Sequence, residues 1–326
     1  MTSLRLLEHM HIFAPGEYFP ACHASTIERL PDGSMCAAWF AGTREQADDV
    51  AIYTARLENG VWTVPCLAAD FPGVPCWNPV LFYNGEALLL FFKAGKVIPQ
   101  WRTFLAESRD GGRTWTAPAE LVRGDVGGRG PVKNKPIRLA DGRILAPASI
   151  ETAEEWYCFA DLSQDNGKTW SKSAPVPMDR EKRTGLGVIQ PTLWQNPDGV
   201  IHMLMRSTEG CLYHSRSRDG TAWSAAEKTD IPNNNSGMDL DMLPGGRLAL
   251  AYNPIAGNWA GRNIVELAIS DDGGKTFYTG AVLENEPPCG TKAPEFSYPA
   301  VVARGTDLYV TYTYKRKTIS YWHFAV

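Results

Sequence analysis

The sequence lacks an excess of basic residues and any long apolar run. Lysine and arginine number 32 against 36 aspartate and glutamate residues, which gives a net charge of -4. This balance argues against a nucleic-acid binder, because such a protein needs a basic surface to neutralise phosphates. No segment approaches the apolar length of a membrane span, and the first residues, MTSLRLLEHMHIF, hold no apolar stretch of secretory length. We therefore expect neither nucleic acid nor a membrane among the partners.

Paired cysteines and metal-binding spacings are also absent. The seven cysteines are odd in number and scattered, with no CxxC, so in the absence of an export signal we expect reduced thiols and a cytoplasmic location. The glycines of GGRG at 127–130 precede no helix that would hold a dinucleotide, and His9 and His11 have no further ligands nearby. We expect no metal and no other cofactor.

One short polar motif recurs along the chain and ends each time in an aromatic residue. Its copies are SRDGGRTW (108–115), SQDNGKTW (163–170), SRDGTAW (217–223), SDDGGKTF (270–277) and a degenerate LENGVW (57–62). The closing aromatic residues recur about every 54 residues, and a repeat of that length indicates an array of supersecondary units.

A second periodic signal alternates with this motif. Turn glycines flanked by strand-like apolar runs are typical of β-hairpins, and they occur at Gly33, Gly85, Gly142, Gly199, Gly246 and Gly305. The two signals together give two hairpins, and hence four antiparallel strands, in each unit. The sequence predicts an all-β fold, a six-bladed β-propeller that forms one domain over residues 1–326, with both termini completing the last blade.

The polar motif has a folding role in this interpretation. Its Ser and Asp side chains can bond nearby backbone amides, its Gly takes the left-handed turn position, and its aromatic residue packs between neighbouring blades. We expect these turns on the side of the ring away from the site. The chain thus resembles the sialidase (neuraminidase) superfamily over essentially its whole length, because that superfamily carries this Asp-box, or BNR repeat, on a six-bladed propeller. Such propellers also include lyases, other glycosidases and non-enzymes.

The innermost strands should line the central channel, so the residues at which they begin are the first candidates for a site. Each blade has a polar residue there, and Pro directly follows four of them, as an edge strand tolerates. The polar residues are His23, Asn78, Lys135, Gln190, Asp239 (or Ser236) and Tyr298. Six polar groups that converge on one axis predict a binding site, although Asn78 is equally well explained as a hydrated channel residue.

Charged and polar residues near the ends of the second strands form a second predicted ring. Its members are Arg44, Lys93, Glu151, Arg206, Asn253, Arg262 and Arg316. Guanidinium groups pair bidentately with carboxylates, and Lys133 and Lys135 add further positive charge. We therefore expect a carbohydrate substrate that carries a carboxylate.

The resemblance implies roles for several of these residues. Sialidases hold the sugar carboxylate with three arginines, and Arg206 and Arg262 match the second and third of them by context. They use an aspartate as acid and base, which Asp48 or Asp49 matches in GTREQADDVAIY. They also use a tyrosine nucleophile activated by a glutamate. Tyr298 lies two residues beyond the usual tyrosine position, on the same strand face.

Two positions depart from the pattern of that superfamily. His23 stands where the first arginine is expected, and Gln190 stands at the position of the activating glutamate. Gln cannot accept a proton, so Tyr298 needs Glu295 or Glu151 as its base if it is to act as a nucleophile. An unperturbed histidine titrates near neutrality, which makes His23 a candidate for proton transfer.

Three functions fit these residues. The first is a sialidase-like exo-glycosidase that removes a terminal acidic sugar from a glycan. The second is a uronate-directed polysaccharide or oligosaccharide lyase, or an atypical His-dependent glycosidase, in which His23 and Tyr298 move protons. The third is a non-catalytic glycan-binding propeller, which the density of titratable groups disfavours.

Overall fold

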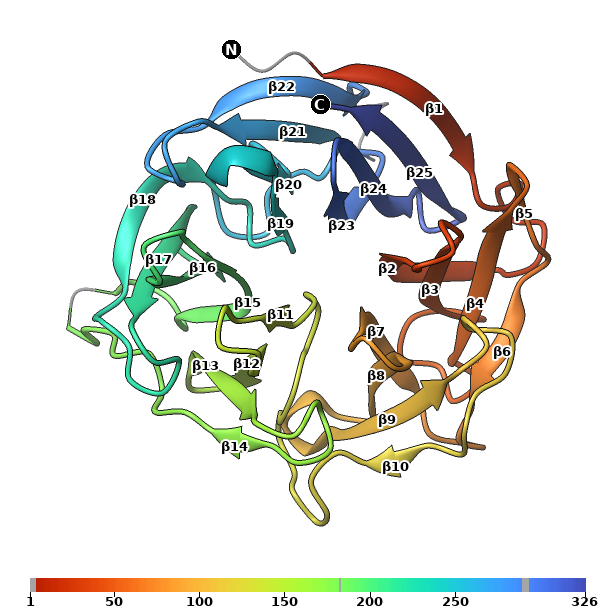
Figure 1. Cartoon of the computed structure of the whole chain (residues 1–326), viewed down its shortest axis with the longest axis horizontal. Helices are drawn as coiled ribbons and strands as arrows, with labels where there is room; N and C mark the ends of the chain where they lie inside the picture. The colour runs from red at the N-terminus through yellow and green to blue at the C-terminus, as the bar shows by residue number, and fades with distance from the viewer. Residues whose placement is uncertain (1–3, 182, 289–292) are drawn as a thin grey trace.

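The computed structural model describes residues 4–181, 183–288 and 293–326, and it shows six antiparallel sheets arranged as blades around a central channel (Figure 1). In each blade the first strand in the order below lies nearest the axis. The first three blades are β2 (Ala21–Arg29), β3 (Met35–Gly42), β4 (Ala51–Glu58) and β5 (Val61–Trp62); β7 (Cys76–Tyr83), β8 (Leu88–Ala94), β9 (Arg102–Ser108) and β10 (Ala119–Glu120); and β11 (Ile137–Arg138), β12 (Ile144–Glu151), β13 (Trp156–Ser163) and β14 (Ser171–Lys172).

The last three blades follow the same order. They are β15 (Val188–Gln195), β16 (Ile201–Ser207), β17 (Cys211–Ser217) and β18 (Glu227–Pro232); β19 (Asp239–Met242), β20 (Leu248–Tyr252), β21 (Ile264–Ser270) and β22 (Tyr278–Asn285); and β23 (Phe296–Arg304), β24 (Asp307–Tyr314), β25 (Thr318–Ala325) and β1 (Arg5–His11). The predicted four-stranded propeller is confirmed, with one unexpected addition, β6 (Cys66–Ala69), which also pairs with β4.

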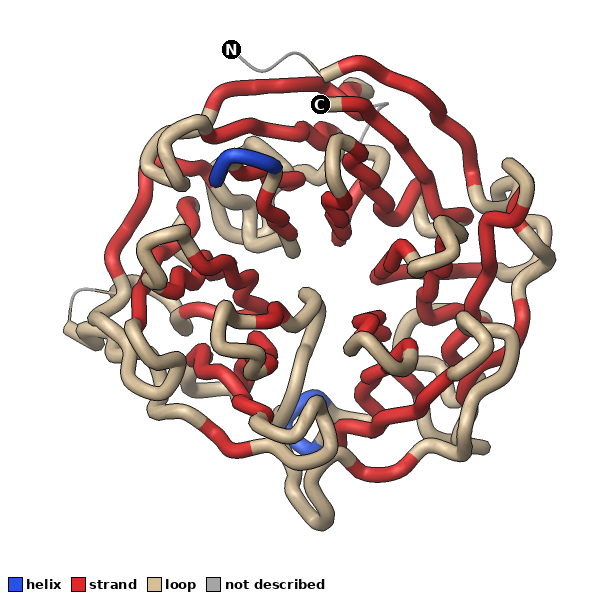
Figure 2. Tube along the Cα trace, viewed as in Figure 1, coloured by secondary structure: helices blue, strands red, loops and turns tan. Residues whose placement is uncertain are grey.

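The last blade closes the ring with both ends of the chain, as predicted. Strand β1 pairs antiparallel with β25, from Arg5 opposite Ala325 to His11 opposite Ser320. Figure 2 shows strands and loops throughout, with two short 3-10 helices, η1 (Ile98–Gln100) and η2 (Pro244–Gly246). Neither helix has the length or the apolar character of a bilayer crossing, and the described part of the chain contains no other helix.

The recurring polar motif forms the same turn in each full copy. In the copy at 163–170, Asp165 Oδ1 accepts hydrogen bonds from the backbone amides of Lys168 (3.1 Å) and Thr169 (2.8 Å), while Ser163 Oγ donates to the same carboxylate at 2.9 Å. Asp110 and Asp272 make equivalent bonds. Because the carboxylate satisfies amides that the turn leaves unpaired, the motif is a folding element.

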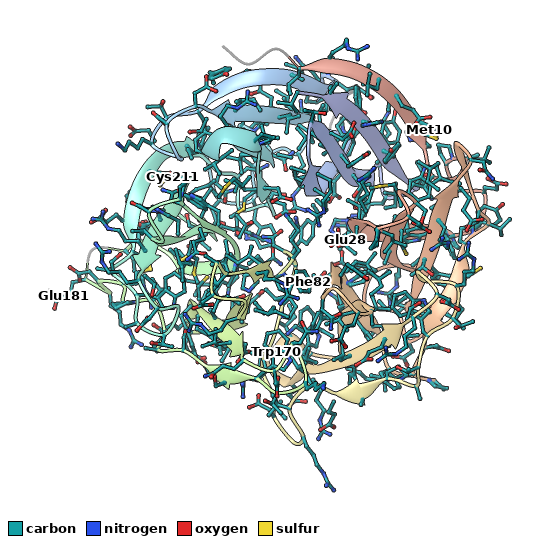
Figure 3. All side chains as sticks on the ribbon, viewed as in Figure 1. Met10, Glu28, Phe82, Trp170, Glu181 and Cys211 are labelled. Atoms are coloured by element: carbon teal, nitrogen blue, oxygen red, sulfur yellow. The ribbon has the colours of Figure 1, made fainter. Side chains whose placement is uncertain are left out.

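The aromatic residue that ends each motif packs between two blades. Trp170, which precedes β14, lies edge-on to Phe91 of the neighbouring blade, with 5.9 Å between ring centroids. Trp223 likewise belongs to the apolar cluster that contains Leu145 and Cys158 of the blade before it. Side chains of this kind fill the spaces between blades (Figure 3). The predicted packing role of these aromatic residues is confirmed.

Strand directions put the Asp-box turns and the candidate site at opposite ends of the blades. In the fourth blade, Ser217, where the Asp-box begins, lies at the level of Ile201, whereas Arg206 lies opposite Ile189 at the other end of the sheet. We call these the Asp-box end and the site end. The predicted separation of the turns from the site is therefore observed.

Candidate active site

Four innermost strands begin with the same irregularity at the site end. Asn78, Gln190 and Tyr298 have positive φ angles of 43°, 50° and 55°, and each lies with the following proline in a β-bulge. Strand β2 has this bulge too, but its positive-φ residue is Ala24 (56°). His23 therefore lies one residue before the position predicted for it, because alternation alone does not reveal the residue that a bulge inserts.

Tyr298 of the last blade contacts two side chains of the fourth blade. Its hydroxyl accepts hydrogen bonds from Arg206 NH1 at 3.0 Å and from Gln190 Nε2 at 3.2 Å. The same Arg206 nitrogen donates to Gln190 Oε1 at 2.8 Å. Phe296, at the usual tyrosine position, is instead fully buried in the core of the last blade. The structure thus brings together three of the predicted site residues, from strands far apart in sequence.

Arg206 is a buried cation whose hydrogen-bond partners are all neutral. Only 2% of the residue is exposed, and its Nε donates to Asn235 Oδ1 at 2.7 Å. Its other partners are Gln190 and Tyr298, and no ion pair joins it to a carboxylate within the described residues. Burying a charge without a counter-ion is costly, so this geometry favours an anionic ligand.

Arg262 and Arg316 differ from Arg206 because both pair with Glu295. Arg262 NH1 lies 3.0 Å from Glu295 Oε1, and Arg316 Nε lies 2.9 Å from Oε2. Ser297 Oγ also donates to Glu295 at 2.7 Å. Burial alone would raise the pKa of Glu295, but the nearby His23 and the two arginines hold that pKa far below its usual range. Glu295 therefore stays ionised and is a poor base for Tyr298.

His23 lies against the other face of the site. Its ring centroid is 4.3 Å from that of Tyr298 and 5.5 Å from that of Phe40, and its buried Nδ1 has no hydrogen-bond partner. Burial, together with the charges of Arg316 and Arg262, holds the pKa of His23 well below the value of a free histidine, although Glu295 opposes this. The expected titration near neutrality is therefore lost, and His23 is a neutral imidazole.

The loop after β3 carries the predicted acid and base. Asp49 accepts hydrogen bonds from the Thr43 hydroxyl (2.5 Å) and amide (2.9 Å), and the hydroxyl bond, despite the opposing effect of burial, lowers its pKa. Asp48 is exposed and pairs with Lys96, at 3.1 Å. Arg44 is exposed on the same loop. Asp49 thus holds the loop in shape, and Asp48 remains the more available carboxylate.

The three predicted lysines donate hydrogen bonds to acceptors within the protein. Lys93 donates to Thr103 Oγ1 at 2.7 Å and to the Arg129 carbonyl at 2.6 Å. Lys133 has three acceptors, Asn134 Oδ1 and the carbonyls of Met238 and Pro299. Burial lowers the pKa of Lys93 and of Lys133 to about 7. These lysines tie segments together rather than pointing freely into the channel.

Lys135 and Asp239 form an ion pair in the same channel. Lys135 Nζ lies 3.1 Å from Asp239 Oδ2, and that carboxylate also accepts from the Thr192 hydroxyl (3.0 Å) and the Val301 amide (2.9 Å). Asp239 is 2% exposed. Asp239 therefore connects its own blade to three others, and the pair explains these two polar residues as cross-links of the ring.

Glu151, Asn78 and Asn253 complete the predicted rings. Burial raises the pKa of Glu151, although the nearby charge of Arg206 opposes this rise. Asn78 is buried at its bulge. The Asn253 amide donates to the carbonyls of Ile264 (2.6 Å) and Phe296 (2.8 Å), which fixes the end of β20. Of these three, Glu151 has the electrostatic surroundings of a proton carrier.

Sequence reasoning missed two residues at this end. Trp259, in the loop between β20 and β21, is 63% exposed, and its ring centroid lies 5.6 Å from the guanidinium carbon of Arg206 and 5.8 Å from that of Arg262. Glu45 pairs with Arg316 and, with His23, lines a cavity of about 200 Å³. A tryptophan in the polar stretch NPIAGNWAGR is the signal that would have revealed Trp259.

No cluster of three or more His, Cys, Asp or Glu side chains suited to a metal ion occurs in the described ranges. The groups that converge on Tyr298 are instead donors of hydrogen bonds and positive charge. They suit an oxygen-rich, negatively charged ligand.

The family profile described as BNR repeat-like domain matches residues 33–310, most of the chain. The chain belongs to this family. The BNR repeat-like protein is also 28% identical over 247 residues to a sialidase from Micromonospora viridifaciens. That match covers 67% of the chain but only 36% of the relative, so the chain spans little more than a third of the relative's length.

Solved structures share the fold of the BNR repeat-like protein. A protein of unknown function from Dyadobacter fermentans has a TM-score of 0.78 at 17% identity, with all of both chains covered. A Trypanosoma rangeli sialidase has a TM-score of 0.75 at 13% identity, over 99% of this chain and 60% of that one. The NanB sialidase from Streptococcus pneumoniae gives 0.72 at 12%, over 99% and 71%. The expected membership of the sialidase superfamily is confirmed.

Proposed function

We propose that this protein is an exo-acting, sialidase-type glycosidase that removes a terminal acidic sugar from a glycan. The observation that carries the proposal is the buried guanidinium of Arg206, which has only neutral partners among the described residues and donates to Tyr298. A substrate carboxylate would supply an ion-pair partner, and the guanidinium carbon of Arg262 lies 5.8 Å from the centroid of the same tyrosine ring. The sialidase relative and the propeller fold agree with this proposal.

In this proposal Tyr298 is the nucleophile and Glu151 is its base. Gln190 cannot accept a proton, and the depressed pKa of Glu295 makes that carboxylate a weak base. Burial raises the pKa of Glu151, which is the direction that a general base working near neutral pH requires. Asp48 serves as the acid on the leaving-group side, since Oδ2 of Asp49 is already engaged by the amide and hydroxyl of Thr43.

A uronate lyase is the second candidate, and the neutral imidazole of His23 favours it. His23 lies against Tyr298 and has an unpartnered Nδ1, so it can accept a proton from the carbon beside a carboxylate. In such an elimination the C–H and glycosidic C–O bonds break, a C=C bond forms, and Tyr298 gives a proton to the leaving oxygen. A cation such as Arg206 neutralises the carboxylate of the substrate, and the proton on the adjacent carbon then becomes more acidic.

One assay separates these candidates. The protein is incubated with sialosides, keto-deoxy-sugar acid glycosides and uronate-terminated oligosaccharides, and both sugar release and the ultraviolet absorbance of an unsaturated uronate are followed. The proposal predicts free saturated acidic sugar, with release abolished in Tyr298→Phe. New absorbance would favour the lyase, while binding without either product would overturn both and leave a glycan-binding propeller.

A further inference from the structure

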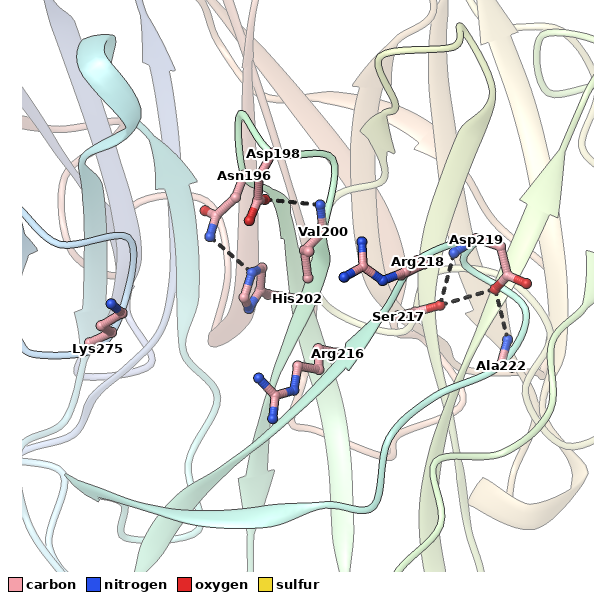
Figure 4. Close-up of a pocket in the computed structure, with 10 residues that line it drawn as sticks. All are labelled: Asn196, Asp198, Val200, His202, Arg216, Ser217, Arg218, Asp219, Ala222 and Lys275. Carbon is pink, nitrogen blue, oxygen red and sulfur yellow. Dashed lines mark hydrogen bonds between the residues drawn. The ribbon is translucent and has the colours of Figure 1, made fainter.

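A cleft of about 640 Å³ at the Asp-box end is lined by residues whose hydrogen bonds to one another are local (Figure 4). Asn196 bonds His202, six positions away, and Asp219 accepts from the amide of Ala222, three positions away. Segment 133–135 differs, because its side chains donate to carbonyl groups of three other blades. The cleft is explained by the turns that form it, whereas segment 133–135 joins distant strands.

Lys133 lies in the loop that leads into β11 and extends toward the middle of the ring (Figure 1). The residue is buried, and its Nζ donates to Asn134 Oδ1 at 2.9 Å and to the Met238 carbonyl at 3.1 Å. The third acceptor is the carbonyl of Pro299, in the bulge of β23. Three acceptors match the three N–H groups of an ammonium, so Lys133 is fixed in place.

Asn134 reaches a second bulge in the same way. An ammonium can only donate, so Lys133 fixes the orientation of the Asn134 amide by bonding its Oδ1. Asn134 Nδ2 then donates to the carbonyls of Gln190 (3.1 Å) and Pro191 (2.9 Å), in the bulge of β15. The two side chains therefore act as a unit, one on each bulge.

Both bulges hold a site residue in an unusual backbone conformation. Tyr298 and Gln190 have φ angles of 55° and 50°, in a region that residues other than glycine rarely adopt. The extra residue of a bulge is unpaired in the ladder, and such strain persists only where the surrounding structure holds it. Lys133 and Asn134 supply contacts of this kind from within the channel.

Gly237 lets the lysine side chain lie close to both site residues. A Cβ atom at this position would lie 3.1 Å from Lys133 Cε, 3.4 Å from Tyr298 Cγ and 3.5 Å from Gln190 Oε1. The stem of the lysine, the tyrosine ring and the glutamine amide therefore surround the same backbone atom. Loss or displacement of the lysine would leave room for both site residues to move.

We propose that Lys133 and Asn134 are positioning residues that hold Tyr298 and Gln190 in their reactive arrangement. The inference rests on the proposed function, in which Tyr298 reacts, and it applies to glycosidic cleavage and to elimination alike. The Tyr298 hydroxyl accepts from Arg206 at 3.0 Å and from Gln190 at 3.2 Å, so a shift of either bulge disturbs both bonds. A misplacement of about 1 Å can lower a reaction rate on the order of 100-fold.

Steady-state kinetics of two variants test the proposal. Lys133→Met keeps most of the apolar stem and removes the ammonium, while Asn134→Asp keeps the shape of the side chain and removes both donors. We expect kcat per folded molecule to fall on the order of 100-fold in K133M and on the order of 10-fold in N134D, with KM changed by less than about 3-fold. A loss in KM instead would show that Lys133 binds the substrate and would overturn the proposal. If K133M does not fold, N134D decides.

Lys93 supplies the matched control. It is also buried, and its Nζ has three oxygen acceptors, Thr103 Oγ1 and the carbonyls of Arg129 and Gly130, none of which belongs to an innermost strand. Lys93→Met should lower the midpoint of urea unfolding about as much as K133M does, because it leaves as many acceptors without a donor. Its kcat should stay within about 3-fold of the wild type. Equal losses of kcat in K93M and K133M would mean that the effect is one of stability alone.

A spectroscopic measurement distinguishes failure of this inference from failure of the proposed function. Protein labelled with ζ-13C-tyrosine is studied by NMR, and Tyr298→Phe assigns the signal of Tyr298. We expect that signal to move or broaden in K133M and in N134D and to keep its position in K93M. A wild type that turns over no acidic sugar would contradict the proposed function, and the signal would still report on the positioning of Tyr298. An unchanged signal in both K133M and N134D would overturn the inference whatever the activity.

Discussion

The two ends of the blades use polar residues in opposite ways. At the Asp-box end each carboxylate bonds amides of its own turn, as Asp165 does with residues three and four positions later. At the site end the polar groups bond across the ring, as Arg206 and Gln190 do with Tyr298, which is 92 and 108 positions away. The first arrangement is complete within one motif, whereas the second leaves a buried guanidinium without an ion-pair partner among the described residues.

This difference separates the residues that build the fold from those available for chemistry. A polar group that is satisfied locally contributes to folding and has little left to offer a ligand. A polar group that only a distant part of the chain brings into place, and that still lacks a counter-charge, is free to bind one. The comparison therefore predicts that substitutions at the two ends affect different measurable quantities.

The largest effect is expected from Arg206→Ala. Loss of the guanidinium should lower kcat/KM for an acidic substrate by on the order of 100-fold or more, because the substrate charge is then left unpaired in a partly desolvated site. Urea unfolding should change little, since no carboxylate among the described residues forms an ion pair with the removed cation. A neutral substrate analogue serves as the control. Equal losses for the charged and neutral substrates would show that Arg206 is structural and would erase the contrast between the two ends.

Trp170→Ala tests the Asp-box end. The indole packs against Phe91 of the next blade, so its removal should lower the free energy of unfolding by about 3 kcal/mol. Activity per folded molecule should persist. Trp259→Ala is the matched control, because that indole is 63% exposed and should change stability by no more than about 0.5 kcal/mol while weakening ligand binding. A stable but inactive W170A protein would contradict the separation of roles.

Gln190→Glu should have a smaller effect, on the ligand affinity and the turnover of the site end. The new carboxylate would lie where Gln190 Oε1 now accepts from Arg206 at 2.8 Å, so it would neutralise that cation and weaken the binding of anionic ligands by about 10-fold. It would also give Tyr298 an adjacent base, which should raise kcat on sialosides. Measurement of KM and kcat separates the two effects. A variant with both constants unchanged would show that Gln190 faces neither the substrate nor the reacting tyrosine.

The smallest expected effect is the change of folding stability with pH that His214 causes. His214 has a folded pKa of about 4 against 6.5 for a free histidine. Between these values the unfolded chain binds more protons than the folded one, so stability should fall as pH drops from about 6.5 toward 4 and level off below that. His214→Gln should flatten this part of the curve in thermal unfolding, and the Asp-box carboxylate Asp165, with a pKa of about 2, should act only at lower pH. An unchanged slope in H214Q would place the acid sensitivity elsewhere.

The repeat made the blade architecture predictable, because two alternating turn signals recur at one period and a closed ring follows from them. The convergence of Arg206, Gln190 and Tyr298 was predictable for the same reason, since equivalent strand positions meet at one end of a propeller. The register of His23 was not, because a bulge adds one residue without disturbing the apolar pattern.

Ion pairs between long side chains were equally hidden from the sequence. Lys135 and Arg316 were predicted to face a ligand, yet Lys135 pairs with Asp239 and Arg316 with Glu295 and Glu45. These partners are more than 20 positions away in sequence, on other strands or loops, so only the folded geometry selects them. Residue type alone therefore overestimates how much charge remains for a substrate.

The pairing of β1 with β25 sets the order in which the molecule can be assembled. During synthesis the segment Arg5–His11 emerges well before its partner, Thr318–Ala325, with the other blades between them. Until then β1 has an unpaired edge, which makes it open to other partners. The ring of blades therefore closes only once β25 is available to pair with β1.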